Sequence, residues 1–130
     1  MNKVILSGHL TADPELRQTN SGKKVVSACL GVNRERKEAD GTYATDFINF
    51  VAWEATAEYL ARYARKGDRV ELCGRWQVRQ YTDQNGNKRI VNEVQVESLS
   101  AFPKQSREPQ YSEPQTPNFS EIKSDEDLPF

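Results

Sequence analysis

Apolar residues recur at every second position in several short stretches before residue 104, and turn-forming residues separate these stretches. In the segment 26–32, Val26, Ala28, Leu30 and Val32 fall on one face of an extended chain. Such alternation is typical of a strand with one buried face. Comparable apolar runs predict four further strands, at 4–6, 45–53, 70–78 and 90–96.

One segment changes to a helical period, with apolar residues spaced i, i+3, i+4 and i+7 at Ala57, Leu60, Ala61 and Ala64. Thr56 is a candidate N-cap for this helix, and Gly67 is a candidate C-terminal stop. The segment 83–87 has the composition of a hairpin turn. Three strands, one helix and a hairpin predict an all-β, five-stranded Greek-key barrel of the OB type.

The alternation along the fourth strand predicts which of its residues lie in the core and which face outward. Its even positions are apolar or small, so we expect these residues in the core: Val70, Leu72, Gly74, Trp76 and Val78. We likewise place Ile90, Val94 and Val96 on the core side of the fifth strand. The odd positions of the fourth strand then face outward and alternate cations with an amide and an aromatic ring: Arg75, Gln77, Arg79 and Tyr81.

The third strand has apolar residues on both faces. With Ile48, Phe50 and Ala52 in the core, Phe47 and Trp53 face outward. Rings beside arginines suit single-stranded nucleic acid, because each base can stack on an aromatic side chain for roughly 1–3 kcal/mol and each phosphate needs a cation nearby. Two plainer interpretations remain open, in which Phe47 and Trp53 are core residues or the arginines belong to an ordinary solvated surface.

Charge and composition divide the 130-residue chain. Residues 1–103 hold 15 Lys+Arg against 13 Asp+Glu, a net +2, whereas residues 104–130 hold 3 against 6, a net −3. Four of the six prolines lie in the second part, which has no apolar repeat until its end. We therefore expect a folded domain over 1–103, a disordered linker over 104–124 and an acidic-apolar tip over 125–130.

Several classes of protein are disfavoured by the sequence. No apolar run is long enough to cross a membrane and the N-terminus lacks a signal-peptide pattern, so we expect a cytoplasmic protein without a membrane partner. His9 is the only histidine, and Cys29 and Cys73 lack the spacing of a zinc site. Gly22-Lys23 lacks the upstream glycine of a phosphate-binding loop. We expect no enzymatic activity, no cofactor and no metal.

The chain resembles the bacterial and phage single-stranded DNA-binding proteins across essentially all of residues 1–100. Five segments carry the resemblance: NKVILSGHLTADPELRQTNSGKKV, VNRERK, TDFINFVAW, AEYLARYARKGDRVELCGRW and YTDQNGNKRIVNEVQV. The last six residues, DEDLPF, are similar to the acidic tip of that family. The resemblance implies an OB fold, a homotetramer, and sequence-tolerant binding of single-stranded DNA (ssDNA) without catalysis.

The resemblance also implies which residues bind DNA. The stacking aromatics of the family correspond to Phe47, Trp53 and Tyr81, and its basic residue at the helix end corresponds to Lys66. A further stacking aromatic is replaced here by Arg36. With Arg34, Arg36 and Lys66 added to Arg75 and Arg79, five cations are expected to contact phosphates. Gln80 and Ala55 stand where the family often has basic residues, which predicts weaker or more salt-sensitive binding.

The resemblance further implies that the tip is the docking segment for proteins of DNA replication, recombination and repair. It combines three carboxylates with two apolar side chains, in the order Asp125, Glu126, Asp127, Leu128, Pro129 and Phe130. An alternative of another class is an OB-fold accessory or regulatory subunit of a primosome-type complex, in which the aromatics pack against a protein. A response of tryptophan fluorescence to poly-dT separates these two hypotheses.

Overall fold

The computed structural model describes residues 1–104. Its elements follow in the order β1 (Val4–Leu10), β2 (Arg17–Gln18), β3 (Lys24–Lys37), β4 (Tyr43–Trp53), α1 (Glu54–Tyr63), β5 (Arg69–Thr82) and β6 (Lys88–Phe102). The five long strands and the single helix correspond to those predicted. The two-residue strand β2 was not predicted, because so short a segment carries no periodicity.

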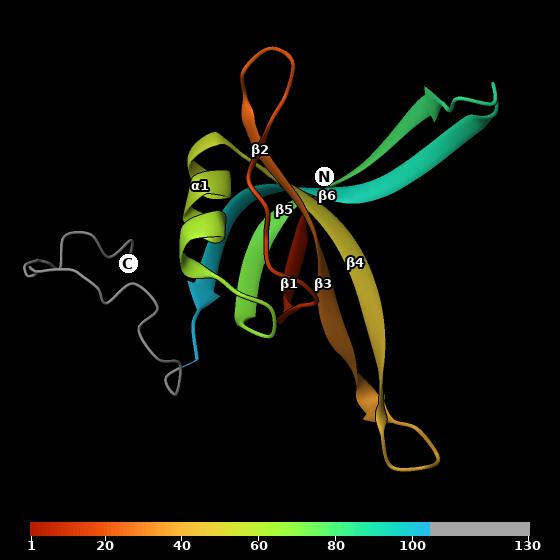
Figure 1. Cartoon of the computed structure of the whole chain (residues 1–130). Helices are drawn as coiled ribbons and strands as arrows, with labels where there is room; N and C mark the ends of the chain where they lie inside the picture. Colours follow the sequence, from red (N-terminus) through yellow and green to blue (C-terminus); the bar gives the residue numbers. More distant parts are fainter. Residues whose placement is uncertain (105–130) are drawn as a thin grey trace, which may run out of the picture.

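The strands form one sheet in the order β1-β5-β6-β4-β3-β2, and an additional pairing of β1 with β3 closes the five long strands into a barrel. All pairings are antiparallel except that of β4 with β6. Figure 1 shows α1 beside the barrel and two hairpins, β3–β4 and β5–β6, that extend away from it in different directions. The predicted OB-fold barrel is confirmed.

The core lies between the barrel strands and the helix. Ala57, Leu60 and Ala64 are completely buried, as the helical spacing predicts. They belong to one apolar cluster with strand residues that include Val26, Leu30, Phe50, Ala52, Val70, Leu72 and Val94. Burial of this cluster is the main source of stability, because each large apolar side chain removed from water contributes roughly 1.5–3 kcal/mol.

The helix boundaries differ from the prediction. The helix begins at Glu54, directly after β4, and Trp53 occupies the N-cap position without a side-chain capping bond. Thr56 is therefore not the N-cap. The helix ends at Tyr63 with Ala64 as its C-cap, so Gly67 is not the residue that stops it. Gly67 instead has φ +89° in the loop before β5, where its backbone N–H donates to the Leu10 carbonyl.

The prediction that Trp76 is a core residue is wrong. Trp76 is 42% exposed, and Val78 and Ile90 are exposed as well. The physical reason is the length of β5 and β6, which continue beyond the barrel as a two-stranded arm (Figure 1). Alternation assigns a face to each residue, but on the arm no further layer of this chain covers the apolar face.

The predicted linker and tip lie outside the described residues, apart from Lys104. Within residues 1–104, no helix combines the length and apolarity that a membrane crossing requires. Cys29 and Cys73 are both free thiols.

Candidate nucleic-acid interface

A groove of about 470 Å³ lies between the β3–β4 strand pair and the β5–β6 strand pair. One wall is formed by Val25, Ser27, Val51 and Trp53, and the other by Arg75, Gln77, Arg79, Glu93 and Gln95. A second hollow of about 400 Å³ shares Ser27, Arg79 and Glu93 with the first and reaches Cys29 and Asn49. The two hollows are neighbours, and Arg79 and Glu93 line both of them.

Strand register explains why these residues share a face. On β3 and β4, Val25 is opposite Trp53 and Ser27 is opposite Val51. On β5 and β6, Arg75 is opposite Gln95 and Gln77 is opposite Glu93. Paired residues project to the same side of a sheet. The parallel pairing of Val51 with Gln95 then joins the two strand pairs into one surface.

The three candidate stacking aromatics are exposed, as strand parity predicts. Phe47, Trp53 and Tyr81 are 67%, 37% and 47% exposed, so the alternative in which Phe47 and Trp53 are core residues is wrong. Trp53 lies in the groove, where its indole Nε1–H donates to Gln95 Oε1 at 2.9 Å. Phe47 lies further along β4, opposite Gly31, and Tyr81 lies on the arm beyond Arg79.

Arg75 and Arg79 both line the groove, but only Arg79 forms an ion pair with a carboxylate. Arg79 donates from Nε to Glu93 Oε2 at 2.9 Å, and its guanidinium carbon is 6.0 Å from the centroid of the Tyr81 ring. Arg75 is exposed, and among residues 1–104 no carboxylate forms an ion pair with it. The groove therefore offers one unpaired guanidinium and one that a buried carboxylate holds.

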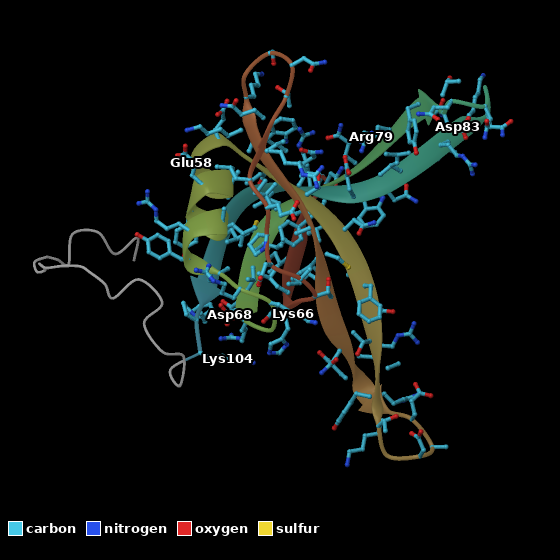
Figure 2. The ribbon with its side chains drawn as sticks, viewed as in Figure 1. Glu58, Lys66, Asp68, Arg79, Asp83 and Lys104 are labelled. Atoms are coloured by element: carbon cyan, nitrogen blue, oxygen red, sulfur yellow. The ribbon has the colours of Figure 1, made fainter. Side chains whose placement is uncertain are left out.

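The structure does not bring the other three candidate cations into this groove. Arg34 forms an ion pair with Asp46 at 3.0 Å, and the hydrogen bonds from Arg34 lower the pKa of the Asp46 carboxyl. Asp46 is opposite Val32, on the core side of the β3–β4 pair rather than on the side of Phe47. Arg36 is exposed near the end of β3. Lys66 lies in the loop after α1, well away from Arg79 (Figure 2).

Glu93 and Gln95 also line the groove, and neither was predicted as a site residue from the sequence. The alternation along the fifth strand does indicate the direction of these two side chains. With Val94 and Val96 facing the core, residues 93 and 95 face outward, in the same way as Arg75 and Arg79 do on the fourth strand. An acid and an amide differ from the rings and cations that are typical of a nucleic-acid surface.

The chemistry of the groove is that of a binding surface. It presents an aromatic ring, two guanidinium groups and the amides of Gln77 and Gln95. Such groups stack on bases and donate hydrogen bonds to phosphates. In the part of the chain that the structure describes, no three His, Cys, Asp or Glu side chains gather closely enough to hold a metal ion.

Comparison with known proteins gives a consistent result. The model of the single-strand binding protein family matches residues 1–102. Single-stranded DNA-binding protein 1 of Lactococcus lactis is 40% identical over all of this chain and 99% of its own length. Single-stranded DNA-binding protein 3 of Streptococcus agalactiae is 39% identical with the same coverage. Single-stranded DNA-binding protein A of Bacillus subtilis is 43% identical over 76% of this chain and 58% of its own length.

Proposed function

The chain belongs to the single-strand binding protein family, and from this membership we propose that it binds single-stranded DNA, without catalysis, in the groove between its two strand pairs. The observation that carries the proposal is the presence of Trp53, Arg75 and Arg79 in one groove. An exposed ring that faces cations across a groove can bind bases and phosphates without reading the sequence. We also propose a cytoplasmic location.

In the proposed complex, bases stack on Phe47, Trp53 and Tyr81. These rings extend from β4 to the arm, so a strand that contacts all three crosses the groove. Arg75 and Arg79 contact phosphates inside the groove. The strand reaches the remaining cations, Arg34, Arg36 and Lys66, only where it leaves the groove. Arg34 has to exchange its ion pair with Asp46 for a phosphate.

Titration with poly-dT at low salt tests this proposal. Stacking on Trp53 is expected to quench tryptophan fluorescence, and affinity should fall linearly with salt on a log–log scale. Arg75→Ala should make that slope shallower by about 0.7, the value for one phosphate of a single strand. Lys23→Ala, at an exposed site before β3 and outside the groove, is the control. Absence of quenching and of binding by the wild-type protein would refute the proposal and favour a protein-docking subunit.

We further propose that the protein assembles as a homotetramer. The support is an uncovered apolar surface on the described part of the chain. Ile5 of β1 is exposed, and the arm exposes Trp76, Val78 and Ile90 on one face. Apolar patches of this kind commonly mark protein interfaces. The mass of the full chain in solution, measured with and without oligo-dT, tests the expectation of four copies.

The segment 125–130 is proposed to recruit replication, recombination and repair proteins. Its composition supports this role, and the similarity to the Lactococcus lactis protein extends over the whole chain. A basic rim on the recruited protein would take the carboxylates and an apolar hollow would take the ring of Phe130. Deleting Phe130 leaves all three acids in place. Binding to such proteins should fail while ssDNA binding persists, whereas a purely solubilising tail would tolerate the deletion.

A further inference from the structure

One carboxylate connects the ring and the cation of the groove. Oε2 of Glu93 accepts hydrogen bonds from Arg79 Nε at 2.9 Å and from Gln95 Nε2 at 3.2 Å. Oε1 of Gln95 accepts from the indole Nε1–H of Trp53 at 2.9 Å. A continuous chain of hydrogen bonds therefore runs from β4 through β6 to β5. Arg79 extends it toward the arm by its contact with the Tyr81 ring.

The position of Glu93 is unfavourable for binding a polyanion. The residue is only 4% exposed and lines both hollows, so its charge acts where phosphates would lie. A buried carboxylate also costs desolvation energy, which its bonds to Arg79 and Gln95 offset. Electrostatics alone would favour a neutral residue at position 93. The Glu93 carboxylate must therefore contribute through the hydrogen bonds that it accepts from Arg79 and Gln95.

The geometry of Arg79 leaves the cation available to DNA. Arg79 uses Nε toward Glu93, and within residues 1–104 its two Nη groups have no hydrogen-bond partner. Its side chain is about half exposed. A guanidinium group held at Nε still presents both Nη groups in a fixed fork, the arrangement that binds a phosphate in two places. Glu93 thus orients Arg79 while it offsets part of its charge.

We propose that Glu93 and Gln95 are positioning residues for ssDNA binding. Glu93 fixes the Arg79 guanidinium and, through Gln95, the indole of Trp53 before the strand arrives. A ring and a cation that are already ordered lose less conformational entropy on binding than freely rotating side chains do. This inference rests on the proposed ssDNA function and adds how the groove is prepared for it.

Substitution of Glu93 tests whether its side chain strengthens or weakens ssDNA binding. In the full-length protein, Glu93→Ala removes a negative charge from the groove, so an electrostatic role predicts tighter oligo-dT binding. A positioning role predicts the opposite, a loss of about three- to tenfold, the range expected for one hydrogen bond. Glu93→Gln keeps an oxygen that accepts from Arg79 and Gln95, and should restore wild-type affinity or exceed it. Glu97→Ala, an exposed acid paired with Lys3 outside the groove, is the charge control.

A second variant tests the link to Trp53 without changing any charge. Gln95→Leu removes the acceptor of the indole bond and leaves Glu93 and Arg79 in place. In a Trp76→Phe background Trp53 is the only tryptophan, so its fluorescence anisotropy decay reports the motion of that ring. The indole should become more mobile and oligo-dT affinity should fall. In a Trp53→Ala background, Gln95→Leu should cause no further loss, because the ring that it positions is absent.

The outcomes separate this inference from the proposed function. If the wild-type protein does not bind oligo-dT, the proposed function fails. If it binds, and folded Glu93→Ala binds equally well or more tightly, the positioning role is wrong. Should Glu93→Ala unfold, as thermal melting would reveal, Gln95→Leu decides alone: unchanged affinity with an equally immobile indole overturns the inference.

Discussion

Phe47 and Phe50 lie three positions apart on β4 and face opposite ways. Phe47 is largely exposed on the groove side, and Phe50 is completely buried. Strand geometry alone produces this difference, because odd and even residues project to opposite faces. The same residue type therefore serves two purposes on one strand, a proposed stacking surface and the core.

Alanine at Phe47, Trp53 or Tyr81 is expected to weaken ssDNA binding by about 1–3 kcal/mol for each ring. Folding stability should change little, because these side chains are exposed. Phe50→Ala is the matched control, with an expected loss of about 3–5 kcal/mol in the free energy of unfolding. Oligo-dT titration and urea unfolding measure the two quantities. A Phe47→Ala variant that loses stability as Phe50→Ala does would show that Phe47 belongs to the core.

At Gly74, β5 lies so close to the β6 backbone that no room is left for a Cβ atom. A Cβ atom there would lie 2.1 Å from the Gln95 carbonyl oxygen and 3.0 Å from the Val96 Cα, both backbone atoms. Gly74→Ala is expected to lower the free energy of unfolding by about 1–3 kcal/mol, as overpacking commonly does. Gly31→Ala is the comparison, since its nearest atom is 3.4 Å away. Equal stability of the two variants in urea would contradict this expectation.

At the scale of elements, the β5–β6 hairpin depends on one turn residue. Asp83 Oδ1 accepts from the backbone N–H groups of Asn85 and Asn87, each at 2.9 Å, and Oδ2 accepts from Arg89 Nε at 2.8 Å. The Arg89 bond and the backbone bonds hold the pKa of the Asp83 carboxyl below its ordinary value of 3.8. The ionised carboxylate therefore favours the folded turn.

This shift predicts a pH-dependent contribution of Asp83. Its stabilisation is complete above the unfolded pKa and is lost as the pH falls through the lower, folded pKa. The difference in unfolding free energy between wild type and Asp83→Asn should therefore shrink between about pH 6 and about pH 3. Urea unfolding across that range measures it. A difference that stays constant with pH would show that ionisation of Asp83 does not support the turn.

In the whole molecule, the uncovered apolar face of the arm predicts a contact between copies of the chain. Because Trp76 is exposed in the single chain, Trp76→Ala should barely change the stability of a dissociated subunit. It should weaken self-association by about 2 kcal/mol or more, as truncation of a central interface tryptophan does. Sedimentation at several protein concentrations measures this. Gln80→Ala, a polar residue on the same face of the arm, is the control. Unchanged association of Trp76→Ala would exclude this face from the interface.

Local patterns along the chain were enough to predict the five long strands and the helix. Alternation along 70–81 depends only on the geometry of an extended chain, so it placed Arg75 and Arg79 outward without any knowledge of the fold. Along 45–53 both faces are apolar, so alternation left open whether Phe47 and Trp53 face outward. The order of the elements then suggested an OB barrel, and the resemblance to the single-stranded DNA-binding proteins completed that prediction.

Contacts between outward residues and the covering of apolar residues depend on how the strands are arranged in three dimensions. Trp53 and Gln95 are 42 positions apart, and Arg34 and Asp46 are 12 apart, so neither pairing is visible in a local pattern. The exposure of Trp76 likewise depends on how far β5 and β6 outrun the other strands. Periodicity fixes the face of a residue, whereas burial and partnership depend on what the rest of the chain places against that face.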